Sequence, residues 1–274
     1  MRNHKIDPAR DTILITGAAG RIATGVRLGL RAAGWRHVRL TDARPVEDVG
    51  DNEEFCAADV SDRETYARLV KGASALVHLA GAGANYSLEH LFRINVRGLF
   101  DVFESARLGG VRRIVYASSN HTFGCYPITT QVTADMPVRP DSLYGAFKVY
   151  GEAVLRAYYE RHDIRSVSLR IGTCFPLPID QRSLSTWLSL PDAARLVDAS
   201  LRHPDPGYLI VKGYSANSRL LHRDPNWQWL GYEPQDNAEN HVDMLRAKGV
   251  DVDGPWEWKE HGGHWAHAPE PRVS

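Results

Sequence analysis

The sequence has few cysteines, no long apolar run and no excess of either charge. Its three cysteines, Cys56, Cys125 and Cys174, are odd in number and far apart, which fits a reducing cytoplasm and not a disulfide framework. Basic and acidic residues number 33 each, so nothing predicts binding to nucleic acid or to an anionic membrane. No apolar run approaches the roughly 18 residues of a membrane span, and residues 1–10 lack the hydrophobic centre of a signal peptide. We therefore expect a cytoplasmic protein.

Apolar and charged residues occur in ordinary proportions, and their order indicates an α/β fold. Hydrophobic residues make up 43% and charged residues 24% of the sequence, as in globular proteins. Short apolar runs alternate with helix-like stretches, which predicts a doubly wound parallel sheet of the Rossmann type. The expected strands cover residues 12–16, 37–42, 54–58, 75–79, 113–118 and 166–171.

The character of the sequence changes after the sixth expected strand, where prolines become frequent. Helix-like stretches at 191–203 and 235–248 flank one short apolar run at 208–212, which is too little for a second nucleotide-binding half. We expect a Rossmann domain over residues 11–173. A smaller substrate-binding lobe and tail, partly interleaved with that domain, is expected over residues 174–274.

A glycine-containing turn directly follows the first expected strand. Gly17 and Gly20 separate this strand from an amphipathic helix, and Ala23 stands at the third position of the pattern. The first glycine permits a tight turn, and the second lets a pyrophosphate approach the helix N-terminus. The spacing differs from the G-x-G-x-x-G of most dehydrogenases, and an ordinary turn is the alternative. The strand–turn–helix context favours a dinucleotide site.

The second expected strand ends in an acid, Asp42. A carboxylate at this position accepts hydrogen bonds from both ribose hydroxyls of the adenosine and repels a 2′-phosphate, which favours NAD over NADP. Arg44 argues the other way, because a nearby guanidinium can hold that phosphate. Since Asp42 has the strand-end position, the predicted cofactor is NAD.

Tyr144 and Lys148 lie four residues apart on an expected helix that runs to about residue 161, so their side chains share one face. A free phenol titrates near pH 10, and a neighbouring ammonium lowers that pKa. Tyr144 could then exchange a proton with a substrate hydroxyl. The pair alone is weak evidence, but the fifth expected strand brings Ser118-Ser119-Asn120-His121 to the carboxyl edge of the sheet, where ligands bind.

Several further positions have structural interpretations. Ser61 is expected to cap one helix, and Asp141-Ser142 the helix that carries Tyr144. His78, within a buried strand, is expected to be a core histidine. Asn95 falls inside the helical stretch 88–107, where a polar side chain needs a partner.

The C-terminal part is rich in tryptophan and contains two closely spaced histidines. Packing or a subunit contact is the expected role of the late tryptophans, rather than stacking on a sugar. His261-Gly-Gly-His264 has metal-like spacing, but no Cys, Asp or Glu pattern joins it, so no metal is expected. The tryptophans concerned are Trp227, Trp229, Trp256, Trp258 and Trp265.

Taken together, the motifs resemble the extended short-chain dehydrogenase/reductase superfamily, of the NAD-dependent epimerase/dehydratase type. The resemblance covers most of the chain and is carried by Thr16-Gly-Ala-Ala-Gly-Arg-Ile, Asp59-Val60, Asn95, Ser118-Ser119 and the Tyr144–Lys148 pair. Further segments are similar to the uronate dehydrogenase family, which oxidises glucuronate and galacturonate to aldarolactones with NAD. These segments are 117–124, 139–145, 170–174, 182–187 and 214–217.

The resemblance implies roles for individual residues. Tyr144 would be the base for the C1 hydroxyl, Lys148 would lower its pKa and hold the nicotinamide ribose, and Ser119 would bind the reacting oxygen. Substrate contacts would come from Ser119, Asn120, His121, Thr173 and Arg182, the arginine holding the carboxylate. Cofactor contacts would come from Gly17, Gly20, Arg21, Ile22, Asp42, Asp59, Val60, Leu79, Ala80, Gly81, Asn95, Ser118, Tyr144, Lys148, Ile171 and Cys174.

One segment departs from the family pattern. Gly81-Ala-Gly-Ala84 stands where the family has a substrate-contacting serine, so a hydroxyl is missing and space is opened. A nucleotide-sugar epimerase or reductase of the same superfamily is the second reading, and a non-catalytic NAD-sensing protein is the third. A sugar acid is the expected small-molecule partner, and relatives of this kind often form homo-oligomers.

Overall fold

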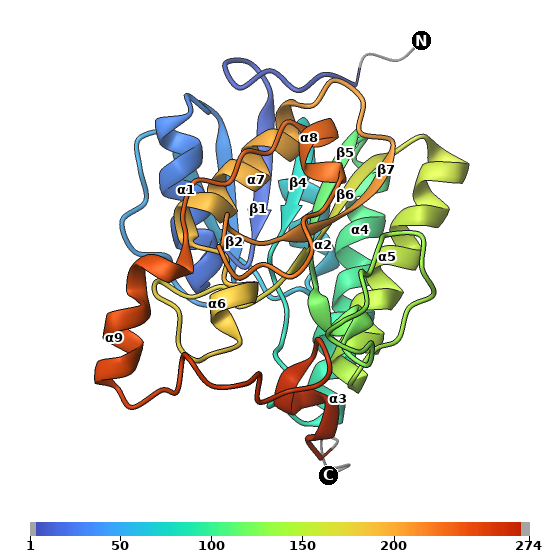
Figure 1. The fold of residues 1–274 in the computed structure, drawn as a ribbon. Helices are drawn as coiled ribbons and strands as arrows, with labels where there is room; N and C mark the ends of the chain where they lie inside the picture. Colours follow the sequence, from blue (N-terminus) through green and yellow to red (C-terminus); the bar gives the residue numbers. More distant parts are fainter. Residues whose placement is uncertain (1–3, 270–274) are drawn as a thin grey trace.

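The computed structural model describes residues 4–269, and the strands within this range form one parallel sheet (Figure 1). Its order is β3-β2-β1-β4-β5-β6-β7. The direction of winding reverses between β1 and β4, and ligands bind at such a point in open α/β sheets. The strands are β1 (Thr12–Thr16), β2 (Val38–Asp42), β3 (Glu53–Ala57), β4 (Ala73–His78), β5 (Arg113–Ser119), β6 (Arg165–Ile171) and β7 (Tyr208–Gly213).

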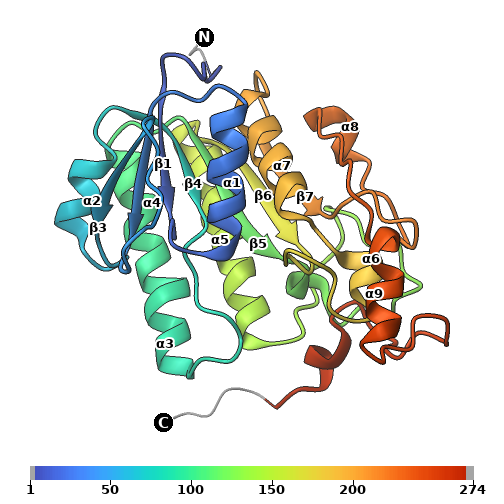
Figure 2. The same ribbon diagram turned by 90° about the vertical axis from the view of Figure 1, so that its left-hand side faces the viewer.

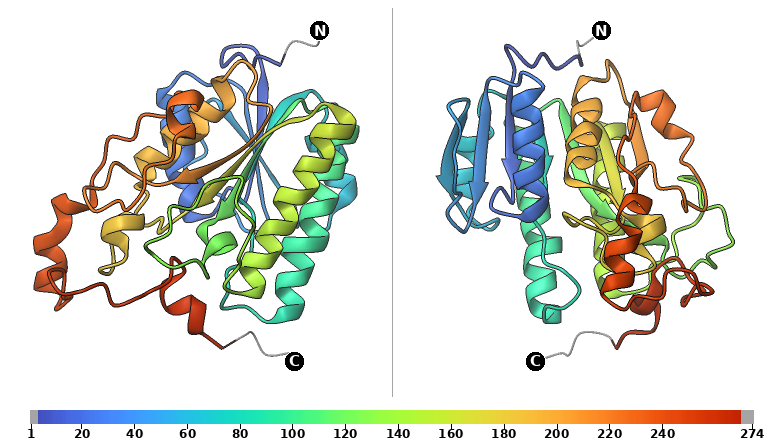
Figure 3. Two further views of the ribbon diagram at one scale, coloured as in Figure 1. Left: turned by 45° about the vertical axis from the view of Figure 1, so that its right-hand side comes forward. Right: turned by 60° about the vertical axis from the view of Figure 1, so that its left-hand side comes forward.

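Helices cover both faces of the sheet, as the alternation in the sequence predicts. The apolar side chains of β1 alternate between faces: Ile13 and Ile15 pack with α1 (Arg21–Ala32) and α7 (Leu190–Arg202), and Leu14 packs with the opposite layer. Figures 2 and 3 show these two layers with the sheet between them. The opposite layer contains α2 (Arg63–Leu69), α4 (Leu99–Leu108) and α5 (Leu143–His162). The predicted Rossmann-type fold is confirmed.

The helical stretch expected at 88–107 is not one regular helix. It begins as α3 (Leu88–Phe92), widens into a π-helical segment (Arg93–Gly98) and continues as α4. Such wide turns are frequent at functional sites. Here the wide turn carries Asn95, which lies buried beside the loop that follows β4.

The two expected helix caps are partly corrected. Asp62, and not Ser61, caps α2, because its carboxylate accepts a hydrogen bond from the Thr65 amide at 3.0 Å. At α5 the cap is Ser142, whose hydroxyl accepts from the Gly145 amide at 3.1 Å. The Ser142 hydroxyl in turn donates to the neighbouring Asp141 carboxylate at 2.9 Å.

His78 is a core histidine, as expected. It is 1% exposed and its Nδ1 lies 2.8 Å from the Thr16 hydroxyl. Its ring packs edge-on against Phe103. Burial, with a smaller contribution from Lys148, lowers the pKa of His78 to about 3, so the ring is neutral at physiological pH.

The C-terminal part of the chain is interleaved with the sheet. The short apolar run at 208–212 is β7, which pairs with β6, and α7 packs against α1. The expected helix at 235–248 is shorter and consists of a 3-10 turn (Ala238–His241) followed by α9 (Val242–Ala247). The division into two domains at residue 173 stays a prediction. Two further short helices are α6 (Ser183–Thr186) and α8 (Asn226–Leu230).

The end of the described chain returns to the carboxyl edge of the sheet. Figures 1 and 2 show this red segment beside the start of α5, at the opposite end of the molecule from the N-terminus. A bridge between Pro127 and Glu260 fixes it to the loop after β5. The helices within residues 4–269 are all too short or too polar to cross a membrane.

Candidate active site

A cavity of about 550 Å³ opens at the carboxyl edge of the sheet. Its wall brings together Ser119 at the end of β5, Asn120 and His121 directly after it, Tyr144 and Lys148 from α5, and Arg182 before α6. These are the residues that the sequence assigned to catalysis and substrate binding. A second hollow adjoins it at Leu79–Ala82 and reaches Gly17, Asp42 and Val60.

The turn after β1 fits a pyrophosphate. Gly17 has φ +70°, and a Cβ there would lie 2.5 Å from the Ala80 amide nitrogen, so only glycine is accommodated. Gly20 stands at the N-cap of α1 and supplies no capping side chain. The free amides and the dipole of α1 are therefore available to an anion. This cradle fits NAD.

Asp42 lies at the end of β2 with its carboxylate 11% exposed. Its oxygens accept hydrogen bonds from the amides of Ala19 at 3.0 Å and Arg44 at 2.9 Å. The Arg44 side chain turns back, donates to the Ala19 carbonyl at 3.2 Å and lies 3.6 Å from the Asp42 carboxylate. Arg44 is thus paired with Asp42 rather than directed to a 2′-phosphate, which agrees with NAD.

Arg21 connects α1 to the segment after β6. Its Nε donates to the Cys174 carbonyl at 3.1 Å, and its guanidinium lies 3.7 Å from the centre of the Phe175 ring. Cys174 is 5% exposed, and burial raises the pKa of its thiol to about 12. The thiol is therefore a neutral small side chain in the cavity wall. Of the other predicted cofactor contacts, Ile22, Leu79, Gly81 and Ile171 line this cavity, and Asp59, Val60 and Ala80 line the adjoining hollow.

The buried Asn95 side chain has hydrogen-bond partners, and these are backbone groups of Ala82. Its Oδ1 accepts from the Ala82 amide and its Nδ2 donates to the Ala82 carbonyl, both at 2.8 Å. The amide therefore fixes the loop after β4, beside Gly81. Neither hollow has Asn95 in its wall, so its effect on a cofactor would pass through this loop.

The surroundings of Tyr144 and Lys148 differ from what their four-residue spacing alone predicts. Lys148 is 5% exposed, and its ammonium donates to the Ala117 carbonyl at 2.8 Å and lies 5.6 Å from the centre of the Tyr144 ring. Burial raises the pKa of Tyr144 to about 12, although hydrogen bonding with Ser119 opposes the rise. Burial also lowers the pKa of Lys148 to about 8, opposed by Glu152. In the protein alone, burial outweighs the lowering of the Tyr144 pKa expected from the lysine.

Ser118 and Ser119 face different partners. Ser118 donates to the Glu152 carboxylate at 2.6 Å, and Glu152 in turn pairs with Arg170 at 2.9 Å, all of them buried. This network anchors the end of β5 to α5 and β6. Ser119 lines the cavity, and its hydroxyl accepts from the His121 amide at 3.2 Å. Ser119 is thus the hydroxyl placed next to Tyr144.

Asn120 and His121 present hydrogen-bonding groups to the cavity. Asn120 is 2% exposed, and its Nδ2 has no hydrogen-bond partner within residues 4–269, so a buried donor is left for a ligand. The His121 Nδ1 lies 2.7 Å from the Asp141 carboxylate, whose side chain is fully buried. Because a carboxylate only accepts, Nδ1 carries the proton. In the neutral ring, Nε2 is therefore an acceptor.

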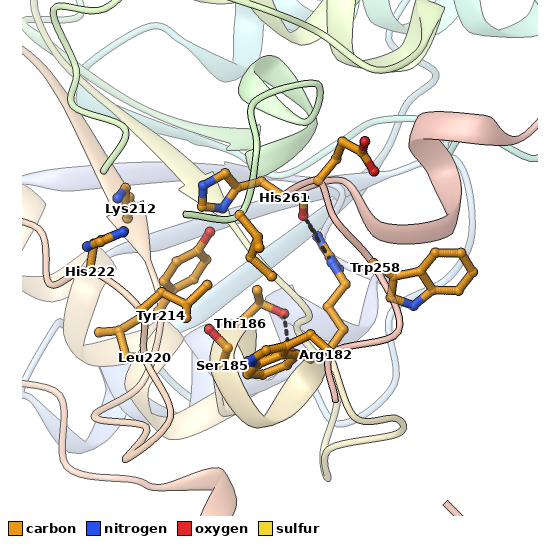
Figure 4. A pocket seen from close by; sticks show the side chains of 13 residues that line it. Arg182, Ser185, Thr186, Lys212, Tyr214, Leu220, His222, Trp258 and His261 are labelled. Atoms are coloured by element: carbon orange, nitrogen blue, oxygen red, sulfur yellow. Dashed lines mark hydrogen bonds between the residues drawn. The ribbon is translucent and has the colours of Figure 1, made fainter. Parts of the chain in front are cut away.

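Arg182 lines the same cavity as Lys148. One edge of its guanidinium is occupied, because Nε and Nη2 donate to the His261 carbonyl at 3.0 and 2.8 Å (Figure 4). Its Nη1 donates to the Thr173 hydroxyl at 3.3 Å, and that hydroxyl also lies 2.9 Å from the Thr186 hydroxyl. Burial lowers the pKa of Arg182. Thr173 therefore contacts the guanidinium and also lines the cavity.

The sequence did not identify three features of this site. Asp141 was taken for a cap and instead orients His121. His264 and Trp265 from the returning C-terminal segment line the cavity, and the Trp265 ring lies 6.1 Å from the His121 ring. Trp227, by contrast, is 2% exposed and packs in the core. The two histidines and the late tryptophans marked this segment in the sequence, but neither signal indicated a place in the cavity wall. No cluster of three possible metal ligands occurs in the described part of the chain.

The sheet order, the glycine turn, the acid at the end of β2 and the Tyr–Lys pair on α5 define a nicotinamide-dependent dehydrogenase of the extended short-chain type. Residues 13–178 match the NAD dependent epimerase/dehydratase family. The chain belongs to this family and is an NAD-dependent oxidoreductase that acts on a CH–OH group.

Several similar proteins align with this chain over most of its length and most of their own. A uronate dehydrogenase of Pseudomonas syringae pv. tomato is 38% identical over 247 residues, which are 89% of this chain and 88% of that protein. A uronate dehydrogenase of Pseudomonas putida is 40% identical over 238 residues, 86% of this chain and 88% of that one. Among solved structures, a variant of uronate dehydrogenase from Agrobacterium tumefaciens complexed with NAD has a TM-score of 0.86 at 34% identity, covering 94% of this chain and 98% of that one.

Proposed function

We propose that this protein oxidises the C1 hydroxyl of a cyclic hexuronate, such as glucuronate or galacturonate, to an aldarolactone with NAD. The observation that carries the proposal is the presence of Arg182 in the same cavity wall as Tyr144 and Lys148. A guanidinium fork suits a carboxylate geometrically. The names of the relatives that cover most of the chain support the same substrate class.

Tyr144 is the base in this proposal. Its phenolate oxygen takes the proton of the C1 hydroxyl, and Ser119 donates a hydrogen bond to the reacting oxygen. When bound, NAD accepts the hydride from C1, and its positive ring favours the phenolate. Lys148, which donates to the Ala117 carbonyl, adds a positive charge 5.6 Å from the centre of the phenol ring. Loss of the proton and the hydride converts C1 into the carbonyl carbon of the lactone.

The remaining polar side chains position the sugar ring. Arg182 binds the carboxylate through the N–H groups of Nη1 and Nη2 that the His261 carbonyl and the Thr173 hydroxyl leave free. Asn120 donates its unpartnered Nδ2 hydrogens, and His121 accepts at Nε2, so two ring hydroxyls are held between them. Ala84 offers no hydroxyl to the sugar, so this set carries the specificity of the site.

The proposal predicts a preference for acid sugars that can be measured directly. NADH formation should be followed with glucuronate, galacturonate, glucose and galactose, each with NAD and with NADP. We expect kcat/KM for the uronates to exceed that for the neutral sugars by roughly a hundredfold or more. A neutral sugar has no carboxylate and so cannot make the two charge-assisted hydrogen bonds proposed for Arg182. Equal turnover of all four sugars would remove the reason to assign a carboxylate to Arg182. Turnover of a UDP-sugar alone would favour the epimerase or reductase reading.

A further inference from the structure

The two histidines of the His261–His264 turn have a spacing that resembles a metal site, but the turn supports the side chain of Arg182. The His261 Nε2 lies 3.0 Å from the Thr130 carbonyl, and burial lowers the pKa of this histidine to about 4. The His261 ring therefore already has a hydrogen-bond partner, in the loop that contains Thr130. Within this turn His264 lines the cavity, and the His261 backbone carbonyl contacts Arg182.

The backbone of this turn fixes the orientation of Arg182. The His261 carbonyl receives two guanidinium N–H groups, which Figure 4 shows as paired dashed lines. An arginine side chain otherwise loses considerable rotamer freedom when it binds a ligand. Because the guanidinium is planar, occupying one edge also determines where the other edge points. The carbonyl therefore sets the direction of the donors that remain for a substrate.

The glycines allow the turn to approach this closely. Gly263 has φ +65°, and a Cβ there would lie 2.7 Å from Arg182 Cδ and 3.1 Å from Nε. At Gly262 a Cβ would lie 2.0 Å from the carboxylate of Asp141, the residue that orients His121. Backbone bonds hold the turn in place, from the His261 amide to the Tyr126 carbonyl at 3.0 Å and from Gly262 to Gly124 at 2.9 Å. The turn thus cannot move aside without losing them.

We propose that Gly263 is a positioning residue for substrate specificity: it brings the His261 carbonyl onto Arg182 and so aims the guanidinium at the carboxylate of the sugar. This inference rests on the proposed function, since it requires Arg182 to bind that carboxylate. In this proposal the site depends on two residues that do not touch the substrate, Gly263 and, through its backbone carbonyl, His261.

The test is Gly263→Ala, with Gly249→Ala as the matched control. Gly249 has φ +80° and no atom within 4 Å of its added Cβ, so the control carries the same backbone cost without the clash with Arg182. For Gly263→Ala we expect KM for glucuronate to rise roughly 10- to 100-fold, because a displacement of about 1 Å has effects of that size. KM for NAD and the turnover of glucose should stay within about twofold. Gly249→Ala should change none of these constants.

A double-variant cycle with Arg182→Met separates this inference from the proposed function. In the Arg182→Met background, Gly263→Ala should change kcat/KM for glucuronate by less than about twofold, because its effect passes through the guanidinium. An equal effect in both backgrounds, or an unchanged KM in the single variant, would overturn the positioning role while leaving the proposed function intact. Normal glucuronate turnover by Arg182→Met itself would overturn both.

Discussion

Replacement of Tyr144 by phenylalanine is expected to lower kcat for glucuronate by roughly a thousandfold or more, with the Kd for NAD changed less than about twofold. The variant retains the ring that packs at 5.7 Å from His121 and removes only the oxygen. General acid–base groups contribute about 10²- to 10⁴-fold to rates. Steady-state NADH formation and NAD binding by fluorescence titration measure the two quantities. Retained turnover would rule out the proposed role of Tyr144.

The same variant gives a second readout through pH. With a pKa of about 12 in the protein alone, Tyr144 is almost entirely protonated at neutrality. The phenolate is the reactive form, so oxidation by the unmodified protein should become faster as pH rises from about 6 to 8. Reduction of a lactone, which uses the protonated phenol, should stay nearly constant over the same range. The Tyr144→Phe variant should show only the pH dependence that arises from the other ionisable groups of the protein. A rate that fell with rising pH in the oxidation direction would contradict the assignment.

Arg182→Met is expected to lower kcat/KM for glucuronate by roughly 10²- to 10³-fold and to leave glucose almost unaffected. Each charge-assisted hydrogen bond contributes about 1.5–3 kcal/mol, and the proposed fork makes two. Arg182 and Trp258 both line a further pocket, which Figure 4 shows, and methionine keeps much of the apolar stem there, so packing is largely preserved. The measurement is the ratio of kcat/KM for the two sugars.

Arg182→Lys is the matched control for charge. Lysine keeps the positive charge but cannot make a planar fork and cannot also satisfy the His261 carbonyl in the same way. We expect an intermediate loss for glucuronate, with most of the defect in KM. A glucuronate preference that survived in both variants would place the carboxylate elsewhere in the cavity.

Much of the fold followed from local patterns. The buried strands of a parallel sheet are short continuous apolar runs, so β1 and β5 could be read from sequence alone. The glycine turn and Asp42 were also recognisable, because their function depends on neighbours along the chain. The π-helical segment around Asn95 was not, since one extra residue in a helical turn leaves the apolar pattern nearly unchanged.

The parts of the site that were missed depend on contacts between distant segments. Asp141 resembles a helix cap in sequence, and only the approach of the loop after β5 pairs it with His121. Arg182 and His261 are 79 residues apart, and no local signal connects an arginine to a backbone carbonyl. The pKa of Tyr144 was misjudged for a related reason: four-residue spacing gives the nearby charge but not the burial that outweighs it.

The most direct test of the account follows the hydrogen on C1. Glucuronate deuterated at C1 should be oxidised with NAD, and the NADH and the sugar product analysed by mass spectrometry and NMR. Oxidation at this carbon predicts deuterium in the NADH, a lactone without deuterium, and a slower single turnover than with unlabelled sugar. NADH without deuterium, or a product that keeps the label at C1, would contradict oxidation of the C1 hydroxyl in the cavity between Tyr144 and Arg182.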